Sequence, residues 1–158
     1  MKELLLETNS ADETRSLGKW LGRLARPGDI FLLTGNLGAG KTTLTQGIVW
    51  GLDSEEYALS PTFVLMREIQ GRLPLYHIDL YRLENKQEIS DLCLDEQIFG
   101  QGLSVIEWGE KGLGVLPPEH LRVNIEYTGD SCRKFLLQAG SRHYQKLLQA
   151  LNRQIKKG

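Results

Sequence analysis

Cysteine is scarce in this sequence of 158 residues. The two cysteines, Cys93 and Cys132, are far apart and form neither a CxxC pair nor a Cys/His pattern with metal-ligand spacing. This scarcity excludes a disulfide-stabilised scaffold and a cysteine-based metal centre. We expect both thiols to be reduced and to serve in packing, as in a cytoplasmic protein.

Long apolar runs and an excess of one charge are also absent. No stretch approaches the roughly 18 apolar residues of a membrane span, and the apolar run after Met1 is too short for a signal peptide. The 19 Lys and Arg residues balance 20 Asp and Glu residues, whereas nucleic-acid-binding domains show a basic patch or stripe. We therefore expect a cytoplasmic protein with no membrane role and only an indirect link to nucleic acid.

The length and the order of patterns predict one α/β domain over residues 1–158. Apolar residues at i, i+3, i+4 and i+7 and capping residues indicate helices, and short apolar runs indicate strands. Helices are expected after Ser10 and Asn85, at 42–50 and at 144–155, and strands at 2–8, 30–34, 62–69, 73–80, 103–108, 120–127 and 133–139. We predict a three-layer fold with a mixed, mainly parallel central sheet plus antiparallel hairpins.

A glycine-rich loop follows the apolar run 30–34. Residues 35–42, GNLGAGKT, match the whole pattern G-x-x-x-x-G-K-[ST]. Small residues let successive backbone N–H groups surround phosphate oxygens, and the next helix presents its positive end. Lys41 is expected to contact the β- and γ-phosphates, and Thr42 to ligate Mg²⁺. This loop predicts a P-loop NTPase-like fold that binds a nucleoside triphosphate; the alternative is an ordinary glycine-rich turn.

The sequence favours ATP over GTP. Many P-loop GTPases read guanine with an N-K-x-D motif, and the nearest match is NKQE at 85–88, with Glu88 in place of Asp. Because this segment is polar and helix-like, we interpret it as a helix start, where the Asn85 side chain caps free amides.

A carboxylate at the end of a second buried strand is the expected partner of the loop. Glu107 ends the run 103–108, where a carboxylate is costly unless a cation or hydrogen bonds compensate it. We predict that Glu107 is the second metal-site residue after Thr42. The alternative is that Glu107 is only the first exposed residue after the strand.

The segment HIDLYR at 77–82 carries a second group of polar side chains. If the strand extends through it, alternation places His77, Asp79 and Tyr81 on one face. Such a face predicts a site for ligation or proton transfer, although a solvated strand edge shows the same pattern.

The third group is SPTF at 60–63. A Thr soon after a P-loop helix is typical of switch segments that respond to the γ-phosphate and Mg²⁺. Ser60 and Thr62 are therefore switch-like candidates, while Ser-Pro also begins ordinary turns.

Taken together, GNLGAGKTT at 35–43, SPTF at 60–63, HIDLYRL at 77–83 and VIEW at 105–108 resemble the bacterial ATPase family required for tRNA threonylcarbamoyladenosine biosynthesis. The resemblance implies a small Mg²⁺-dependent ATPase that acts with the threonylcarbamoyltransferase and its inactive paralogue. These partners modify the adenosine next to the anticodon in tRNAs that read codons beginning with A. The ATPase would bind the pair and reset or regulate it, so its own link to tRNA is indirect.

The resemblance also implies roles for individual residues. Lys41, Asp79 and Glu107 would be catalytic, and Thr42, Glu107 and Asp79 would hold Mg²⁺. The nucleotide would contact Thr14, Gly38, Ala39, Gly40, Lys41, Thr42, Thr43, Trp108 and Arg133, and the loop pattern itself adds Gly35. Ser60 and Thr62 would belong to the switch-like segment, and the polar pattern at 77–82 adds His77, Tyr81 and Arg82 to this set. Asn36 departs from the commonest family loop, which has Asp there; Asn keeps the size and hydrogen bonding of Asp but loses its charge.

Two other functions fit the loop. A small-molecule kinase would use the same loop, but such kinases carry an arginine-containing lid that is not evident here. A non-hydrolysing nucleotide switch would bind without releasing phosphate. In the favoured hypothesis Asp79 or Glu107 orients the attacking water, and a partner or Arg82 supplies an arginine finger.

Overall fold

The computed structural model describes residues 1–36, 40–58 and 66–157. A seven-stranded sheet runs through its centre, in the order β1-β7-β6-β2-β5-β4-β3. The strands are β1 (Glu3–Thr8), β2 (Ile30–Thr34), β3 (Met66–Ile69), β4 (Leu75–Asp79), β5 (Leu103–Glu107), β6 (Leu121–Tyr127) and β7 (Arg133–Ala139). The pairs β6–β2, β2–β5 and β5–β4 are parallel, and the outer pairs are antiparallel. The predicted mixed sheet with antiparallel hairpins is confirmed.

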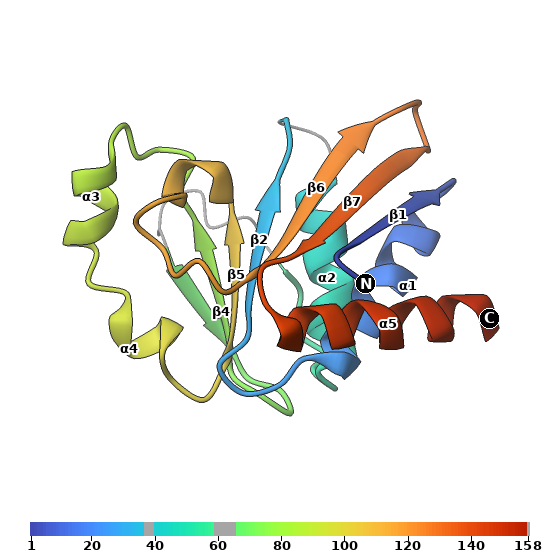
Figure 1. Ribbon diagram of the computed structural model, residues 1–158, viewed down its shortest axis with the longest axis horizontal. Helices are drawn as coiled ribbons and strands as arrows, with labels where there is room; N and C mark the ends of the chain where they lie inside the picture. Colours follow the sequence, from blue (N-terminus) through green and yellow to red (C-terminus); the bar gives the residue numbers. More distant parts are fainter. Residues whose placement is uncertain (37–39, 59–65, 158) are drawn as a thin grey trace.

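Helices cover both faces of this sheet (Figure 1). They are α1 (Ala11–Leu24), α2 (Lys41–Gly51), α3 (Lys86–Asp91), α4 (Asp95–Ile98), the 3₁₀ helix η1 (Gly109–Gly112) and α5 (Arg142–Lys157). One core joins α1, α2 and α5 to the sheet, and a second joins α3, α4 and the segment around η1 to its other face. The three-layer prediction is therefore confirmed.

Strands β2 and β5 form the centre of the sheet and are buried along their full length. Their apolar runs were expected to be buried on both faces, and they are. Both strands end toward the same edge because they are parallel. The residues that follow β2 and β5 therefore meet at this carboxyl edge, where ligands bind in open α/β sheets.

Glycines let α1 and α2 pack closely. A Cβ on Gly47 of α2 would lie 2.1 Å from the Arg15 carbonyl oxygen, and one on Gly18 of α1 would lie 2.3 Å from that of Leu44. Real Cβ atoms essentially never approach so near, so only glycine allows the observed separation of the helices. This packing holds the helix that begins at Lys41 firmly against the domain.

The predicted helix starts have the expected caps. The Ser10 hydroxyl accepts a hydrogen bond from the Glu13 N–H, and the Asn85 side chain accepts one from the Glu88 N–H. The second cap supports the interpretation of residues 85–88 as a helix start.

The structure differs from the sequence predictions in two short helices and in the bounds of some elements. Helix α4 and the 3₁₀ helix η1 were not expected, because four-residue elements are too short to show periodicity. Strand β4 ends at Asp79 and does not extend through Tyr81. The single domain over 1–158 stays a prediction.

No helix in the described part of the chain is both long and apolar enough to cross a membrane.

Candidate functional site

Strand β2, the glycine-rich loop and α2 follow one another as predicted. Gly35 and Gly40, which flank the undescribed residues 37–39, both have positive φ, of 135° and 109°. Residues that carry a side chain rarely adopt these backbone φ values, so glycine suits both positions. Gly38 and Ala39, two of the predicted phosphate-binding residues, lie outside the described residues.

Lys41 begins α2 and is buried at 5% exposure. Its Nζ donates hydrogen bonds to the carbonyl oxygens of Gly35 at 2.6 Å and Asn36 at 3.3 Å. The same Nζ lies 3.5 Å from the centroid of the Trp108 ring, a cation–π contact. The Lys41 ammonium thus lies between the start of the loop and the end of β5.

Burial and nearby acids act in opposite directions on Lys41. Desolvation lowers the pKa of its ammonium, while the carboxylates of Glu110, Glu107 and Asp79 raise it, and the net direction is downward. Three carboxylates therefore lie near this cation, and sequence reasoning had missed Glu110.

The two predicted metal-site carboxylates lie side by side. Asp79 and Glu107 are register partners at the ends of β4 and β5, and their exposed fractions are only 9% and 3%. Glu107 is therefore not simply the first exposed residue after its strand, and that alternative is wrong. Two buried carboxylates in adjacent positions repel one another unless a cation is near.

The fit of Mg²⁺ can be tested on these donors. Carboxylate and hydroxyl oxygens are the hard ligands that Mg²⁺ prefers, and it is usually held by one or two carboxylates together with phosphates. Asp79 and Glu107 supply such carboxylates, and Thr42 lies in the first turn of α2 beside Lys41. This donor set fits a Mg²⁺ ion that is held together with phosphates. Among residues 1–36, 40–58 and 66–157, no group of three or more His, Cys, Asp or Glu is placed to hold a metal.

His77 lies one pleat before Asp79 on β4 and is completely buried. Its Nε2 contacts the Oε2 atom of Glu107. Sequence alternation predicted the shared face of His77 and Asp79, but not this contact, because it depends on the register between β4 and β5.

The segment after β4 turns away from the strand. The Asp79 side chain accepts a hydrogen bond from the Tyr81 N–H at 2.9 Å, which turns the backbone, and Tyr81 is 50% exposed. The Tyr81 ring packs 5.0 Å from that of Trp108. Tyr81 is therefore held near the site by its contact with Trp108, and not by a place on the same strand face as His77 and Asp79. Arg82 follows it in the same segment.

Trp108 has an unusual backbone. Its φ of 59° and ψ of 39° lie in the left-handed region, which bulky residues seldom adopt. Such outliers gather at functional sites. The turn directs the ring toward both Lys41 and Tyr81.

A small cavity of about 110 Å³ lies beside the start of α2. Its lining includes four of the predicted nucleotide contacts, Thr14, Gly40, Thr43 and Arg133, together with Ala11, Asp130 and Ser131. The Arg133 side chain lies against Gly40, where an added Cβ would be 3.4 Å from its Nε. Thr14, matched only through the resemblance, is buried and lies 2.7 Å from the Thr8 hydroxyl. The structure thus brings these four residues together; Ser60 and Thr62 lie outside the described residues.

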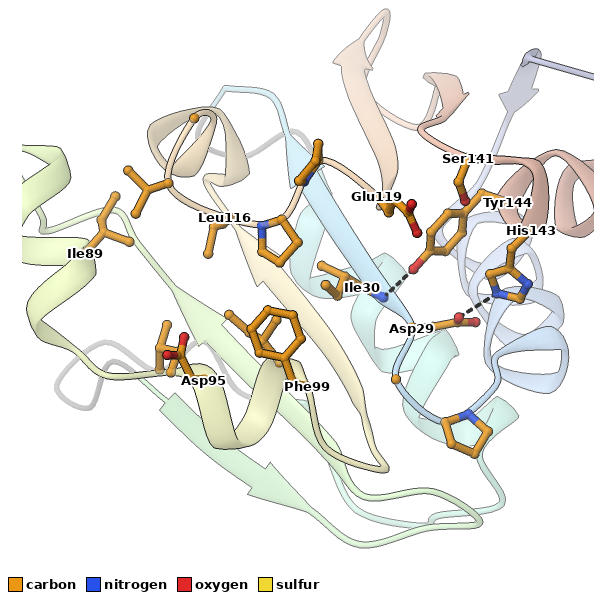
Figure 2. A pocket seen from close by; sticks show the side chains of 18 of the residues that line it. Asp29, Ile30, Ile89, Asp95, Phe99, Leu116, Glu119, Ser141, His143 and Tyr144 are labelled. Carbon is orange, nitrogen blue, oxygen red and sulfur yellow. Dashed lines mark hydrogen bonds and ion pairs between the residues drawn. The ribbon is translucent and has the colours of Figure 1, made fainter.

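A larger cavity, of about 1190 Å³, lies at the opposite end of β2 (Figure 2). We call it the α4–α5 groove; it runs between Phe99 after α4 and His143 at the start of α5. Two of its polar groups meet partners from the chain itself. Asp29 lies 2.6 Å from His143 Nε2, and the Tyr144 hydroxyl accepts a hydrogen bond from the Ile30 N–H. These contacts join α5 to the start of β2, so we do not choose the groove as the functional site.

The parallel strands, the glycine-rich loop and the acidic edge define an α/β protein of the P-loop NTPase-like class. The chain also matches the family model described as "Threonylcarbamoyl adenosine biosynthesis protein TsaE" over residues 8–135. The chain therefore belongs to the TsaE family, which confirms the resemblance found in the sequence.

Individual relatives agree with this assignment. The chain is 41% identical to the tRNA threonylcarbamoyladenosine biosynthesis protein TsaE of Bacillus subtilis over 154 residues, 97% of this chain and 96% of that protein. It is 38% identical to the Treponema pallidum protein of the same name, over 80% of this chain and 94% of that protein. The crystal structure of YdiB from Bacillus subtilis superposes with a TM-score of 0.84 at 36% identity, covering 97% of this chain and 96% of that one.

Proposed function

We propose that this chain is an ATP hydrolase that binds ATP and Mg²⁺ at the carboxyl edge of β2, β4 and β5. The observation that carries the proposal is the gathering of Lys41, Asp79 and Glu107 at the end of a P-loop strand. A triphosphate with its metal would supply both the anion that Lys41 suits and the cation that the carboxylates need.

Each residue has a proposed task in this reaction. Lys41 would contact the β- and γ-phosphates, and the loop amides around Gly40 would surround the phosphate oxygens. Thr42 and Glu107 would hold Mg²⁺, which when bound neutralises charge on the transferring phosphoryl group. Asp79 would orient water for in-line attack.

The small cavity would take the outer part of the nucleotide. Thr14, Thr43 and Arg133 line it directly beside the P-loop helix. The Trp108 ring would flank the nucleotide while packing against the Lys41 side chain. We propose ATP as the nucleotide because residues 85–88 form a helix start and not a guanine-reading motif.

The hydrolysis would serve threonylcarbamoyladenosine formation in tRNA. We propose that the chain binds the threonylcarbamoyltransferase and its inactive paralogue and resets or regulates them, so its link to tRNA is indirect. The proposed location is the cytoplasm, where the free thiols of Cys93 and Cys132 are ordinary. An arginine from a partner, or Arg82, would complete the charge stabilisation in the transition state.

The test measures ATP hydrolysis by the chain alone and with the purified transferase pair. We expect slow turnover alone, faster turnover with the pair, and a loss of about 100-fold or more in Lys41→Ala, since one electrostatic contact to a transition state has this effect. Lys146→Ala, which removes an exposed lysine on α5, is the matched control. Equal rates for Lys41→Ala and the wild type would contradict the proposal.

The products of the same assay separate the alternatives. Transfer of phosphate to a nucleoside or metabolite would show a kinase. Nucleotide binding without phosphate release, even with the pair present, would show a non-hydrolysing switch.

A further inference from the structure

His77 occupies an unusual position for an imidazole. It is the middle residue of the five-residue strand β4 and has an exposed fraction of 0%. Its neighbour on the other face, Ile78, is also completely buried. An apolar side chain would fill this place in the core without needing hydrogen bonds, whereas a polar ring there is costly unless it is hydrogen-bonded.

The described polar contact of this ring is with a single residue, Glu107. Nε2 contacts Glu107 Oε2, whereas Nδ1 finds no hydrogen-bond partner within the described ranges. The contact to Glu107 is therefore the one described polar interaction that accounts for an imidazole here.

The sheet explains why His77 reaches Glu107 and not its direct neighbour. The register pairs His77 with Val105, and Asp79 with Glu107. His77 and Glu107 are thus diagonal neighbours, a separation that long side chains span. His77 approaches the carboxylate from inside the sheet, while Asp79 lies beside it at the edge.

We infer that His77 is a positioning residue for the metal site: through Nε2 it holds Oε2 of Glu107, and so orients the carboxylate that takes Mg²⁺. This inference rests on the proposed function, because it needs a metal at that edge. It assigns His77 no contact with substrate or with the reacting atoms.

The physical gain is preorganisation. A glutamate at a strand end has three rotatable side-chain bonds, and fixing them when the metal binds costs conformational entropy. The buried imidazole fixes the carboxylate in advance. Groups that orient metal ligands in this way typically contribute about 10- to 100-fold in metal affinity.

Two substitutions separate the two ring nitrogens. The amide nitrogen of Gln reaches the place of Nε2, whereas that of Asn reaches only the place of Nδ1. Mn²⁺ replaces Mg²⁺ as the probe, and its binding to the ADP-loaded chain is measured by electron paramagnetic resonance. We expect Mn²⁺ affinity to fall about tenfold or more in His77→Asn and to be largely restored in His77→Gln.

Two controls show that the effect passes through Glu107. ADP affinity in the presence of a chelator should equal the wild-type value in both variants. In a Glu107→Gln background, His77→Asn should cause no further loss of Mn²⁺ affinity. Equal Mn²⁺ affinity in His77→Asn and the wild type, or an additive loss in the double variant, would overturn the inference.

A measurement on the wild type covers the case in which a variant does not fold. The imidazole ¹⁵N resonances of His77 should shift when Mg²⁺ is added to the ADP-loaded chain, and unchanged resonances would overturn the inference. If the wild type binds neither ADP nor Mn²⁺, the proposed function itself is wrong, so the two failures are distinguishable.

Discussion

Strand β2 begins beside one buried carboxylate, Asp29, and ends at the sheet edge that carries two, Glu107 on the neighbouring β5 and Asp79 on β4. At its amino end both oxygens of Asp29 have partners from the chain, because Oδ2 accepts from the Arg26 N–H at 2.9 Å and Oδ1 lies 2.6 Å from His143 Nε2. At its carboxyl end Glu107 contacts His77 and Asp79 accepts a hydrogen bond from the Tyr81 N–H, but these two carboxylates also lie next to one another and near Lys41.

This difference separates structural charges from functional ones. The Asp29–His143 pair joins the start of β2 to α5, and both residues line the α4–α5 groove of about 1190 Å³. The smaller cavity, beside Gly40, belongs to the end where negative charge is concentrated around Lys41. In this chain the arrangement of buried charge, not the size of a cavity, indicates the functional end.

Replacing one carboxylate at each end of β2 with its amide tests most directly whether the two ends differ in function. Glu107→Gln should lower partner-stimulated ATP hydrolysis about 100-fold, because it removes a proposed metal ligand. Asp29→Asn should leave hydrolysis unchanged and lower the free energy of unfolding by about 1–3 kcal/mol, since it weakens a buried pair. Hydrolysis assays and urea unfolding measure the two effects. Similar losses of activity in both variants would contradict the distinction.

The functional end also depends on how firmly α2 holds Lys41. Gly47→Ala should destabilise the protein by about 1–3 kcal/mol, because the new Cβ would meet the Arg15 carbonyl oxygen at 2.1 Å. Gly129→Ala is the matched control, since its Cβ would make only an ordinary contact of 3.6 Å with Cys132. Urea unfolding of the two variants should differ clearly, and equal midpoints would refute the close helix packing.

The structural end should respond to alkaline pH. Burial raises the pKa of Tyr144 to about 12, above the ordinary value of 10 for tyrosine. The unfolded chain therefore loses this proton first, so stability present below pH 10 is lost between pH 10 and about 12, by up to about 1.4 kcal/mol per pH unit.

Tyr144→Phe tests this smaller effect. It should cost about 1 kcal/mol at neutral pH, because the Ile30 N–H loses its acceptor. Above pH 10 the wild type loses stability through Tyr144 and the variant does not. The difference between their free energies of unfolding should therefore narrow. A constant difference from pH 8 to 11.5 would show that the Tyr144 pKa is not raised.

The sequence predicted local structure where the signal itself is local. The caps at Ser10 and Asn85 and the apolar runs of β2 and β5 depend on neighbouring residues, and they were found as expected. The end of β4 was predicted too late, because the Asp79 side chain turns the backbone at Tyr81.

Contacts between helices and strands that are distant in sequence could not be predicted from the sequence, because they depend on the fold. The pairing of His77 with Glu107 depends on the β4–β5 register, which is set by tertiary packing and not by either strand alone. The position of Arg133 beside Gly40 was accessible only through the family resemblance, because the hairpin of β6 and β7 lies far from the loop in sequence. Glu110 was missed because η1 has no helical periodicity.

Amide hydrogen exchange with and without ATP and Mg²⁺ tests most directly which end of β2 is functional. We expect slower exchange on nucleotide addition in residues 40–43, 79–81 and 107–110, and unchanged exchange in residues 26–30 and 141–144 around the α4–α5 groove. Protection confined to the α4–α5 groove, with no change at residues 40–43, would show that the nucleotide binds at the other end of β2.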